Sequence, residues 1–215
     1  TAFDKAGVPY PSNGWNYDDL LEMVQKLNIP GEQYGIGIPA DISDTSNVST
    51  MFAPILWAMG GDFLTPDGSA PAINNEAGVK AITYWSDLYL KYKVAHEGTP
   101  NFTTTRDIQP LFEANKIALI AQGSNAFDSF KKNPDLKWGM VLAPDGISRG
   151  GGWTMGVPEG AANTEGAKQF LLWLSQPEIM AKVMNRTPSN LKAQALPPWN
   201  DPEKAIFSEA EKGAR

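Results

Sequence analysis

Apolar residues recur every three to four positions in several stretches of the chain, which is the spacing of one face of a helix. The strongest pattern covers 75–92, where Val79 and Ile82 follow the helical period and Asn74 or Asn75 can cap the first turn. The same spacing predicts further helices over 17–28, 50–59, 105–115, 126–132, 164–175 and 177–185, and weaker helix near 202–212.

Short apolar runs between these helices predict strands. They cover 34–39 (YGIGIP), 116–121 (KIALIA), 137–144 (KWGMVLAP) and 153–157. We interpret 40–49 as a polar loop. Because strands alternate with helices along the chain, the pattern predicts an α/β fold with an at least partly parallel sheet.

Charge and composition exclude several classes of function. The 215-residue chain has a net charge of −6 and no basic run, so nothing points to nucleic acid or an anionic membrane as a partner. It contains no cysteine, which excludes disulfides, thiol catalysis and cysteine-based metal sites. His96 is the single histidine, and we expect it to bind the last carbonyls of the preceding helix. We predict no metal and no cofactor.

The motifs of common catalytic sites are missing from the sequence. No serine lies in a G-x-S-x-G elbow, there is no P-loop, and GIGIPA has the wrong spacing for a dinucleotide fingerprint. The acidic residues fall mostly at predicted helix starts or in turns, which favours capping and solvated charges. We therefore expect a protein that is not an enzyme. No apolar run is long enough to span a bilayer.

Aromatic and small polar residues provide the groups of a binding site instead. The chain has 7 Trp, 6 Tyr and 9 Phe, whose rings can stack on sugar faces. Short amides and hydroxyls gather in three predicted loops, SNVST (46–50), GSNAF (123–127) and RGGGW (149–153). In the last of these the glycines leave the backbone bare for close approach, and Trp153 adds a flat apolar face.

Seven segments occur in a recognisable order: FDKAGVPYPSNGWNYDDLLEMVQKL, FAPILWAMGGDFL, INNEAGVKAITYWSDLY, PLFEANKIALIAQGSNAF, WGMVLAPDG with GGGWTMGVP, GAKQFLLWLSQPEIMAKV and RTPSN. In this order they resemble the family 1 extracellular solute-binding proteins of ABC importers, which are maltose-binding-protein-like and mostly bind sugars. The resemblance spans nearly the whole chain.

The resemblance implies the type II periplasmic-binding-protein-like fold, in which two α/β lobes joined by hinge strands close on a ligand. It also implies that the chain is incomplete and covers chiefly the C-terminal lobe. Residues 1–152 would form most of that lobe, 153–185 would cross over and pack on the N-terminal lobe, and 186–215 would return as a truncated end. Helix 164–175 would then lack its partner surface and expose apolar area.

A set of ligand-binding positions follows from the same resemblance. They are Gly123, Ser124, Asn125, Gly151, Gly152, Trp153 and Arg186, with Asn47 and Thr50 as weaker candidates. Asn125 stands where relatives often have a stacking tryptophan, so we expect hydrogen bonding at this position. Trp57 fits the buried side of a helix, and we expect it in the core.

The function implied is that of the extracytoplasmic solute-binding component of an ABC transporter, which delivers a sugar or oligosaccharide to the membrane permease. Such a protein is periplasmic or lipid-anchored at the cell surface, and meets the membrane only through the permease or the anchor. Three alternatives stay open. They are a binding protein for a phosphorylated polyol or other polar solute, held by the glycine loop and Arg186, a glycoside-active enzyme with paired carboxylates, and an interaction module without a transport role.

Overall fold

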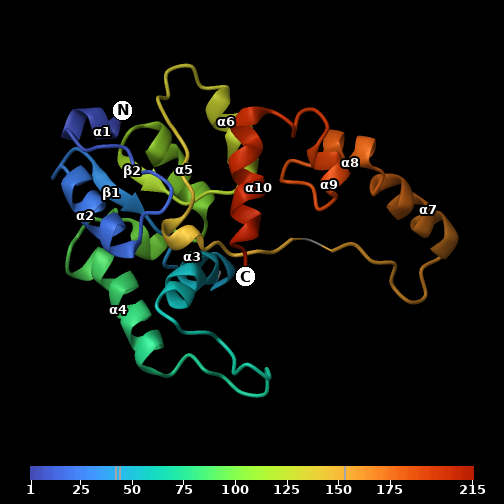
Figure 1. Cartoon of the computed structure of the whole chain (residues 1–215), viewed down its shortest axis with the longest axis horizontal. Coiled ribbons are helices and arrows are strands. Elements are labelled where there is room, and N and C mark those ends of the chain that lie inside the picture. Colours follow the sequence, from blue (N-terminus) through green and yellow to red (C-terminus); the bar gives the residue numbers. More distant parts are fainter. Residues whose placement is uncertain (42, 44, 153) are drawn as a thin grey trace.

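The computed structural model describes residues 1–41, 43, 45–152 and 154–215. The chain forms a rounded body and an elongated arm that projects from it (Figure 1). We call residues 1–150 and 201–215 the body, and residues 154–200 the arm. The chain leaves the body in an extended segment and returns through short helices, so that its last helix lies beside α6 (Figure 1).

The described helices and strands are, in chain order, α1 (Ala2–Ala6), α2 (Tyr17–Leu27), β1 (Tyr34–Gly37), α3 (Thr45–Ala58), α4 (Glu76–Leu90), η2 (Thr99–Asn101), α5 (Thr105–Glu113), β2 (Ile117–Ile120), η3 (Ser124–Ala126), α6 (Phe127–Lys131), η4 (Pro144–Gly146), α7 (Thr164–Leu174), α8 (Pro177–Val183), α9 (Leu191–Gln194), η5 (Pro202–Lys204) and α10 (Ala205–Lys212). The predicted helices are confirmed, and apart from α3 and α10 their ends agree to within two residues; the weaker helix near 202–212 divides into η5 and α10.

The sheet at the centre of the body is parallel. β1 pairs with β2 in a register that places Ile36 opposite Leu119, and a further parallel bridge joins Ile36 to Ala95. The Ile36 N–H donates to the Val94 carbonyl at 3.1 Å, which completes this side of the sheet. The predicted α/β class with a partly parallel sheet is therefore confirmed.

Helix α2 shows how closely the elements of the body approach each other. Asn16 caps it in a capping box, because its side chain accepts from the N–H groups of Asp18 and Asp19. On the buried side of α2, a Cβ at Gly35 of β1 would lie 2.1 Å from the carbonyl oxygen of Val24. Only glycine permits this contact between a helix backbone and a strand backbone.

The start of α3 differs from the prediction. The helix begins at Thr45, inside the segment that we expected to be a polar loop, so Pro54 lies in its interior and not in its first turn. Proline removes a helical hydrogen bond at this point. The neighbouring side chains of Phe52, Ile55 and Leu56 are all buried, and this tertiary packing holds the helix together.

The inward face of α4 also differs from the prediction. Val79 and Ile82 are exposed. The buried residues of α4 are Gly78, Ala81, Trp85 and Leu88. The turn before the helix passes close to this face, since a Cβ at Gly78 would lie 1.8 Å from the carbonyl oxygen of Ile73. This contact requires glycine on the inner face, which the apolar spacing alone does not reveal.

Two predicted strands do not form. Residues 137–143 form no strand, and the backbone of Leu142 bonds to side chains of the loop after α1 instead. Leu142 accepts from the indole N–H of Trp15 at 2.7 Å and donates to the side chain of Asn13 at 3.2 Å. Residues 154–157, within the second predicted strand, are irregular and mostly exposed.

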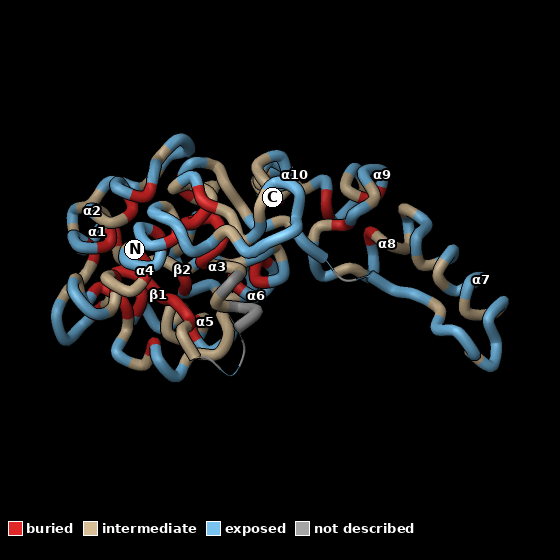
Figure 2. The backbone as a smooth tube through the Cα atoms, turned by 90° about the horizontal axis from the view of Figure 1, so that it is seen from below, coloured by how far each residue is buried: buried red, intermediate tan, exposed pale blue. Residues whose placement is uncertain are grey.

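The arm is far less buried than the body (Figure 2). A small cluster joins α8 and α9 through Ala181, Ala193 and Trp199, whose indole N–H donates to the Ala181 carbonyl at 3.1 Å. Helix α7 buries no residue at all, and Leu172 and Trp173 are 69% and 45% exposed. Apolar exposure on this helix agrees with the sequence-based expectation.

Candidate functional site

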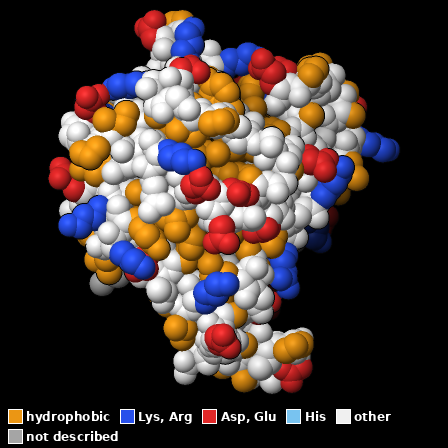
Figure 3. All heavy atoms as spheres, turned by 60° about the vertical axis from the view of Figure 1, so that its left-hand side comes forward, with side chains coloured by type: hydrophobic (Ala, Val, Ile, Leu, Met, Phe, Trp, Pro, Cys, Tyr) orange, Lys and Arg blue, Asp and Glu red, His pale blue; other side chains and the backbone are white. Residues whose placement is uncertain are grey.

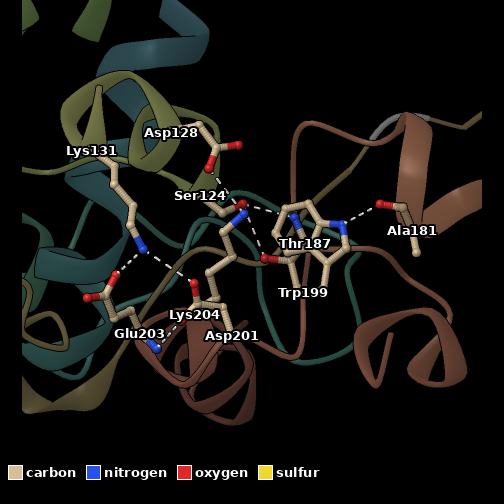
Figure 4. Close-up of polar contacts among 9 residues, drawn as sticks. All are labelled: Ser124, Asp128, Lys131, Ala181, Thr187, Trp199, Asp201, Glu203 and Lys204. Carbon is tan, nitrogen blue, oxygen red and sulfur yellow. Dashed lines mark hydrogen bonds and ion pairs between the residues drawn. The ribbon is translucent and has the colours of Figure 1, made fainter. Parts of the chain in front are cut away.

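The loop after β2 carries three of the predicted ligand-binding residues. It follows the carboxyl end of a parallel strand, where α/β proteins commonly place their ligands. The Ser124 hydroxyl accepts a hydrogen bond from the Thr187 N–H at 2.9 Å and another from the Thr187 hydroxyl at 3.2 Å (Figure 4). Ser124 and Arg186, which are distant in sequence, are therefore brought to one place. We call residues 123–125 with 186–187 the junction.

The polar side chains of the junction differ in exposure. Asn125 and Arg186 are exposed, whereas Ser124 and Thr187 are half-buried. Gly123 leaves room for the amide of Asn125, since a Cβ at Gly123 would lie 3.0 Å from the Asn125 Oδ1 atom. The junction thus exposes an amide and a guanidinium to solvent, next to the hydrogen-bonded pair of Ser124 and Thr187.

A buried lysine fixes the helix that follows the junction loop. Lys204 is 4% exposed, and its ammonium lies 3.2 Å from Asp128 of α6. The same ammonium lies 4.6 Å from the ring centre of Trp199 and 5.1 Å from that of Phe127. These contacts hold α6 against η5 and the end of the arm.

A second, exposed ion pair lies beside the first. Lys131 of α6 bonds to Glu203 at 2.6 Å and approaches Asp201 at 3.4 Å (Figure 4). The hydrogen bond to Glu203 raises the pKa of Lys131. The N–H of Glu203, and then Lys131, lower the pKa of Asp201. Sequence reasoning missed both Lys131 and Lys204, because their partners are distant in the chain.

The glycine loop is occupied by other backbone. Gly150 donates to the Arg215 carbonyl at 3.0 Å, and a Cβ at Gly150 would lie 3.1 Å from that of Ala214. Its bare backbone therefore serves this pairing. Gly151 and Gly152 are exposed, and Trp153 lies outside the described residues.

The weaker candidates lie in a helix and not in a loop. Residues 46–50 belong to α3, which corrects the loop assignment. Thr50 is half-buried and engaged in contacts, and the side chain of Asn47 lies outside the described part of the structure. Trp57 is half-buried at the edge of the core, where its indole N–H donates to Asp62 at 3.2 Å and Arg215 lies over its ring.

His96 has a structural role that differs from the expected one. No hydrogen bond in the described part of the chain joins it to a helix carbonyl, and its Nδ1 atom accepts from the Gly98 N–H at 2.9 Å. Its ring lies against those of Tyr34 and Phe102, with centroids 4.7 and 5.4 Å away. Burial lowers the pKa of His96, so the neutral ring is favoured.

Two hollows of the described surface lie away from the predicted residues. One of about 570 Å³ is lined by α6, residues 133–140 and η5, and another of about 360 Å³ lies between β1 and the end of α4. Neither is lined by a residue of the junction. Two residues of the junction, Asn125 and Arg186, are nevertheless exposed to solvent.

Charge and metal-binding groups add little to this surface. On the face shown in Figure 3, acidic and basic side chains are interspersed over the body. Within the described residues, no group of three acidic or histidine side chains is placed to hold a metal ion. No helix in that part of the chain is long and apolar enough to cross a membrane.

Parallel strands with exposed polar groups just beyond the end of β2 are the arrangement in which α/β binding proteins commonly hold a ligand. The sequence profile described as bacterial extracellular solute-binding protein matches residues 1–206. The chain therefore belongs to the bacterial extracellular solute-binding protein family.

Solved structures share this fold. One is an ABC transporter solute-binding protein from Thermotoga lettingae bound to α-D-tagatose, with a TM-score of 0.80 and 23% identity. The match covers 97% of this chain and 55% of that one. Maltose-bound MalE3 of T. maritima matches with a TM-score of 0.76 and 21% identity, over 99% of this chain and 56% of that one. UgpB of Mycobacterium tuberculosis in complex with glycerophosphocholine matches with a TM-score of 0.75 and 14% identity, over 100% of this chain and 55% of that one. The type II periplasmic-binding-protein fold is thereby confirmed.

A curated relative is the probable amino-acid ABC transporter periplasmic-binding protein y4oP of Sinorhizobium fredii. It is 26% identical over 190 residues, which is 85% of this chain and 41% of the relative. The chain therefore spans less than half of this relative and somewhat more than half of the solved structures.

Proposed function

We propose that this chain forms chiefly the C-terminal lobe of the solute-binding component of an ABC importer. In this proposal the whole protein closes on a sugar or oligosaccharide between two lobes and delivers it to the permease. The observation that carries the proposal is the junction, where Asn125 and Arg186 are exposed beyond the carboxyl end of β2. The ligands of the similar structures, α-D-tagatose and maltose, support a sugar.

The division of the chain into lobes is part of this proposal. Residues 1–152 form most of one lobe, 153–185 pack on the other lobe, and 186–215 return. The exposed side chains of α7 support this arrangement, since Phe170, Leu172 and Trp173 offer a surface for a second lobe. Closure is then a population shift that ligand contacts with both lobes drive.

The proposal assigns no catalysis to the chain. The exposed groups at the junction are the amide of Asn125 and the guanidinium of Arg186, which are neither nucleophiles nor general acids at neutral pH. The family description supports a position outside the cytoplasm, and we propose the periplasm or a lipid-anchored position at the cell surface. The permease is its partner at the membrane.

Isothermal titration of the whole protein with maltose, D-tagatose and a panel of oligosaccharides tests the proposal. We expect one of them to bind, and Asn125→Ala and Arg186→Ala each to weaken that binding about tenfold, as expected for a hydrogen bond lost to a ligand. Lys116→Ala is the matched control, because Lys116 is an exposed cation at the opposite end of β2. Absence of carbohydrate binding, or equal loss in the control, contradicts the proposal.

A second candidate ligand is a phosphorylated polyol. It is favoured by the exposed guanidinium of Arg186, a group suited to oxyanions, and by the similar structure that binds glycerophosphocholine. Titration with glycerophosphocholine and glycerol 3-phosphate at low and high salt separates it from a neutral sugar. Affinity for a phosphate ester falls with salt, whereas affinity for a neutral sugar does not.

A further inference from the structure

We propose that Thr187 determines how the junction recognises a ligand, because it turns the Ser124 hydroxyl into a hydrogen-bond donor. The inference rests on the proposed function and deepens it. Thr187 is then a positioning residue that acts through Ser124. The ligand group that fits is an oxygen acceptor, such as the hydroxyl or ring oxygen of a sugar or the oxygen of a phosphate ester.

The hydroxyl oxygen of Ser124 has a limited number of hydrogen-bonding positions. A serine hydroxyl has two acceptor positions and one hydrogen to donate. The Thr187 N–H fills one acceptor position of Ser124 at 2.9 Å, and the Thr187 hydroxyl fills the other at 3.2 Å (Figure 4). No hydrogen bond within the described part of the chain uses the remaining hydrogen of Ser124, which is half-buried at the surface.

Thr187 is held in place. The next residue, Pro188, is fully buried, and a residue before proline is restricted to extended conformations. The carbonyl of Pro188 accepts from the side chain of Gln194 at 2.8 Å, which ties this segment to α9. The backbone of Thr187, and with it the direction of its N–H, is therefore set by buried structure and not by the exposed loop.

The loop is held from its other end. Asp128, four residues after Ser124, bonds to the buried Lys204. Both ends of the loop segment are thus attached to the returning part of the chain, at Thr187 and at Lys204. A hydroxyl held in this way is preorganised, so it loses little entropy when a ligand binds.

The chemical consequence is selectivity. Because both acceptor positions of Ser124 are taken, a ligand N–H or ammonium gains no hydrogen bond from this hydroxyl, while a ligand oxygen does. Donation is strengthened because hydrogen bonds in a chain polarise one another. The junction is thereby matched to oxygen-rich solutes.

A double-mutant cycle in the whole protein tests this inference, with maltose, D-tagatose and glycerophosphocholine as the titrated probes. Ser124→Ala should weaken binding of the probe that binds by about tenfold, and Thr187→Val by about threefold to fivefold. Thr187→Val should have no further effect in the Ser124→Ala background, because Thr187 acts through that hydroxyl. Thr187→Ser keeps the second donor and should restore binding to within about twofold of wild type.

Each outcome has a defined meaning. If Thr187→Val weakens binding equally in both backgrounds, or Thr187→Ser is as weak as Thr187→Val, the inference is wrong while the proposed function stands. If neither these probes nor the oligosaccharide panel binds the wild-type protein, the proposed function is wrong and the inference falls with it. Binding of maltose or tagatose identifies a sugar oxygen as the acceptor of the Ser124 hydrogen, and binding of glycerophosphocholine alone identifies a phosphate oxygen.

A readout without ligand tests the contact itself. The Thr187 amide should exchange its hydrogen at least about tenfold faster in Ser124→Ala, since its acceptor is removed. Far-ultraviolet circular dichroism and the unfolding midpoint of each variant show whether it is folded. Unchanged exchange at Thr187 in folded Ser124→Ala contradicts the inference whatever the probes do.

Discussion

The body and the arm are built from similarly apolar segments but bury them very differently. In the body, Leu56 of α3 and Leu88 of α4 are almost completely enclosed. In the arm, α7 buries no residue, and Leu172 is 69% exposed. Since burial of a large apolar side chain contributes about 1.5–3 kcal/mol, α7 lacks most of the packing that a comparable body helix has.

This difference teaches that an apolar pattern predicts a helix without showing what covers it. The body buries its helices around its own sheet and is self-sufficient. The arm has a small cluster of its own around Trp199, but α7 has none. We infer that the arm depends on a second lobe, and the predictions below test this contrast.

The largest expected effect comes from truncating one leucine in each region. Leu56→Ala should lower the free energy of unfolding by about 3 kcal/mol, because it leaves a cavity in an enclosed core. Leu172→Ala should change it by less than about 0.5 kcal/mol in this chain, because the side chain is already in water. Urea denaturation of both variants measures the difference. Equal losses would show that α7 is packed in this chain after all.

The next effect tests the close approach of helix and strand in the body. Gly35→Ala places a Cβ against the carbonyl oxygen of Val24, and should destabilise the body by about 2 kcal/mol through overpacking. The control is Gly156→Ala, since a Cβ at Gly156 meets nothing within 4 Å. Thermal unfolding followed by circular dichroism compares the two. A neutral Gly35→Ala would mean that α2 can move away from β1 without loss.

A smaller effect is expected at the seam between the regions. Lys204→Met removes the buried ammonium from Asp128 and from the rings of Trp199 and Phe127, and should cost about 1–2 kcal/mol. Lys131→Met removes exposed contacts with Asp201, Glu203 and the Phe127 ring, and should cost less than about 0.5 kcal/mol because Lys131 is solvated. Chemical denaturation of both variants ranks them. The reverse order would contradict the assignment of Lys204 as the residue that joins arm to body.

The smallest effect is a pH dependence confined to the body. Because burial lowers the pKa of His96, the unfolded chain binds a proton at higher pH than the folded chain does. Stability is therefore complete above about pH 6.5 and falls as the pH drops towards the lower pKa of the folded state. Urea denaturation at pH 7.5 and 5.5 measures this change, and His96→Gln should reduce it. If His96→Gln shows the same stability difference between the two pH values as the wild type, the pH dependence arises from carboxylates and not from His96.

Local signals were sufficient for much of the fold. The capping residue Asn16 and the apolar spacing of 17–28 identify α2, and the same logic identifies α4, because these elements depend on neighbours in sequence. Residues 137–143 were mispredicted because their backbone bonds to Trp15 and Asn13, which are more than a hundred residues away. A pattern of apolar residues carries no information about such partners.

The site was predictable only in part. The family resemblance pointed to Ser124 and Arg186, and the structure brings them together. Thr187 and Lys204 carry no recognisable local signal. The role of Thr187 depends on a contact with Ser124, 63 residues away, and that of Lys204 depends on a contact with Asp128 of α6. The glycine loop was overinterpreted at Gly150, where the bare backbone accommodates the segment around Ala214.

Amide hydrogen exchange of α7 tests the central claim most directly. It is measured in this chain alone and in the whole protein, with the amides of α2 and α4 as internal references. The account predicts that α7 amides become at least about a hundredfold more protected in the whole protein, while the reference amides change little. Equal protection of α7 in the two samples would contradict the claim that a second lobe covers this helix.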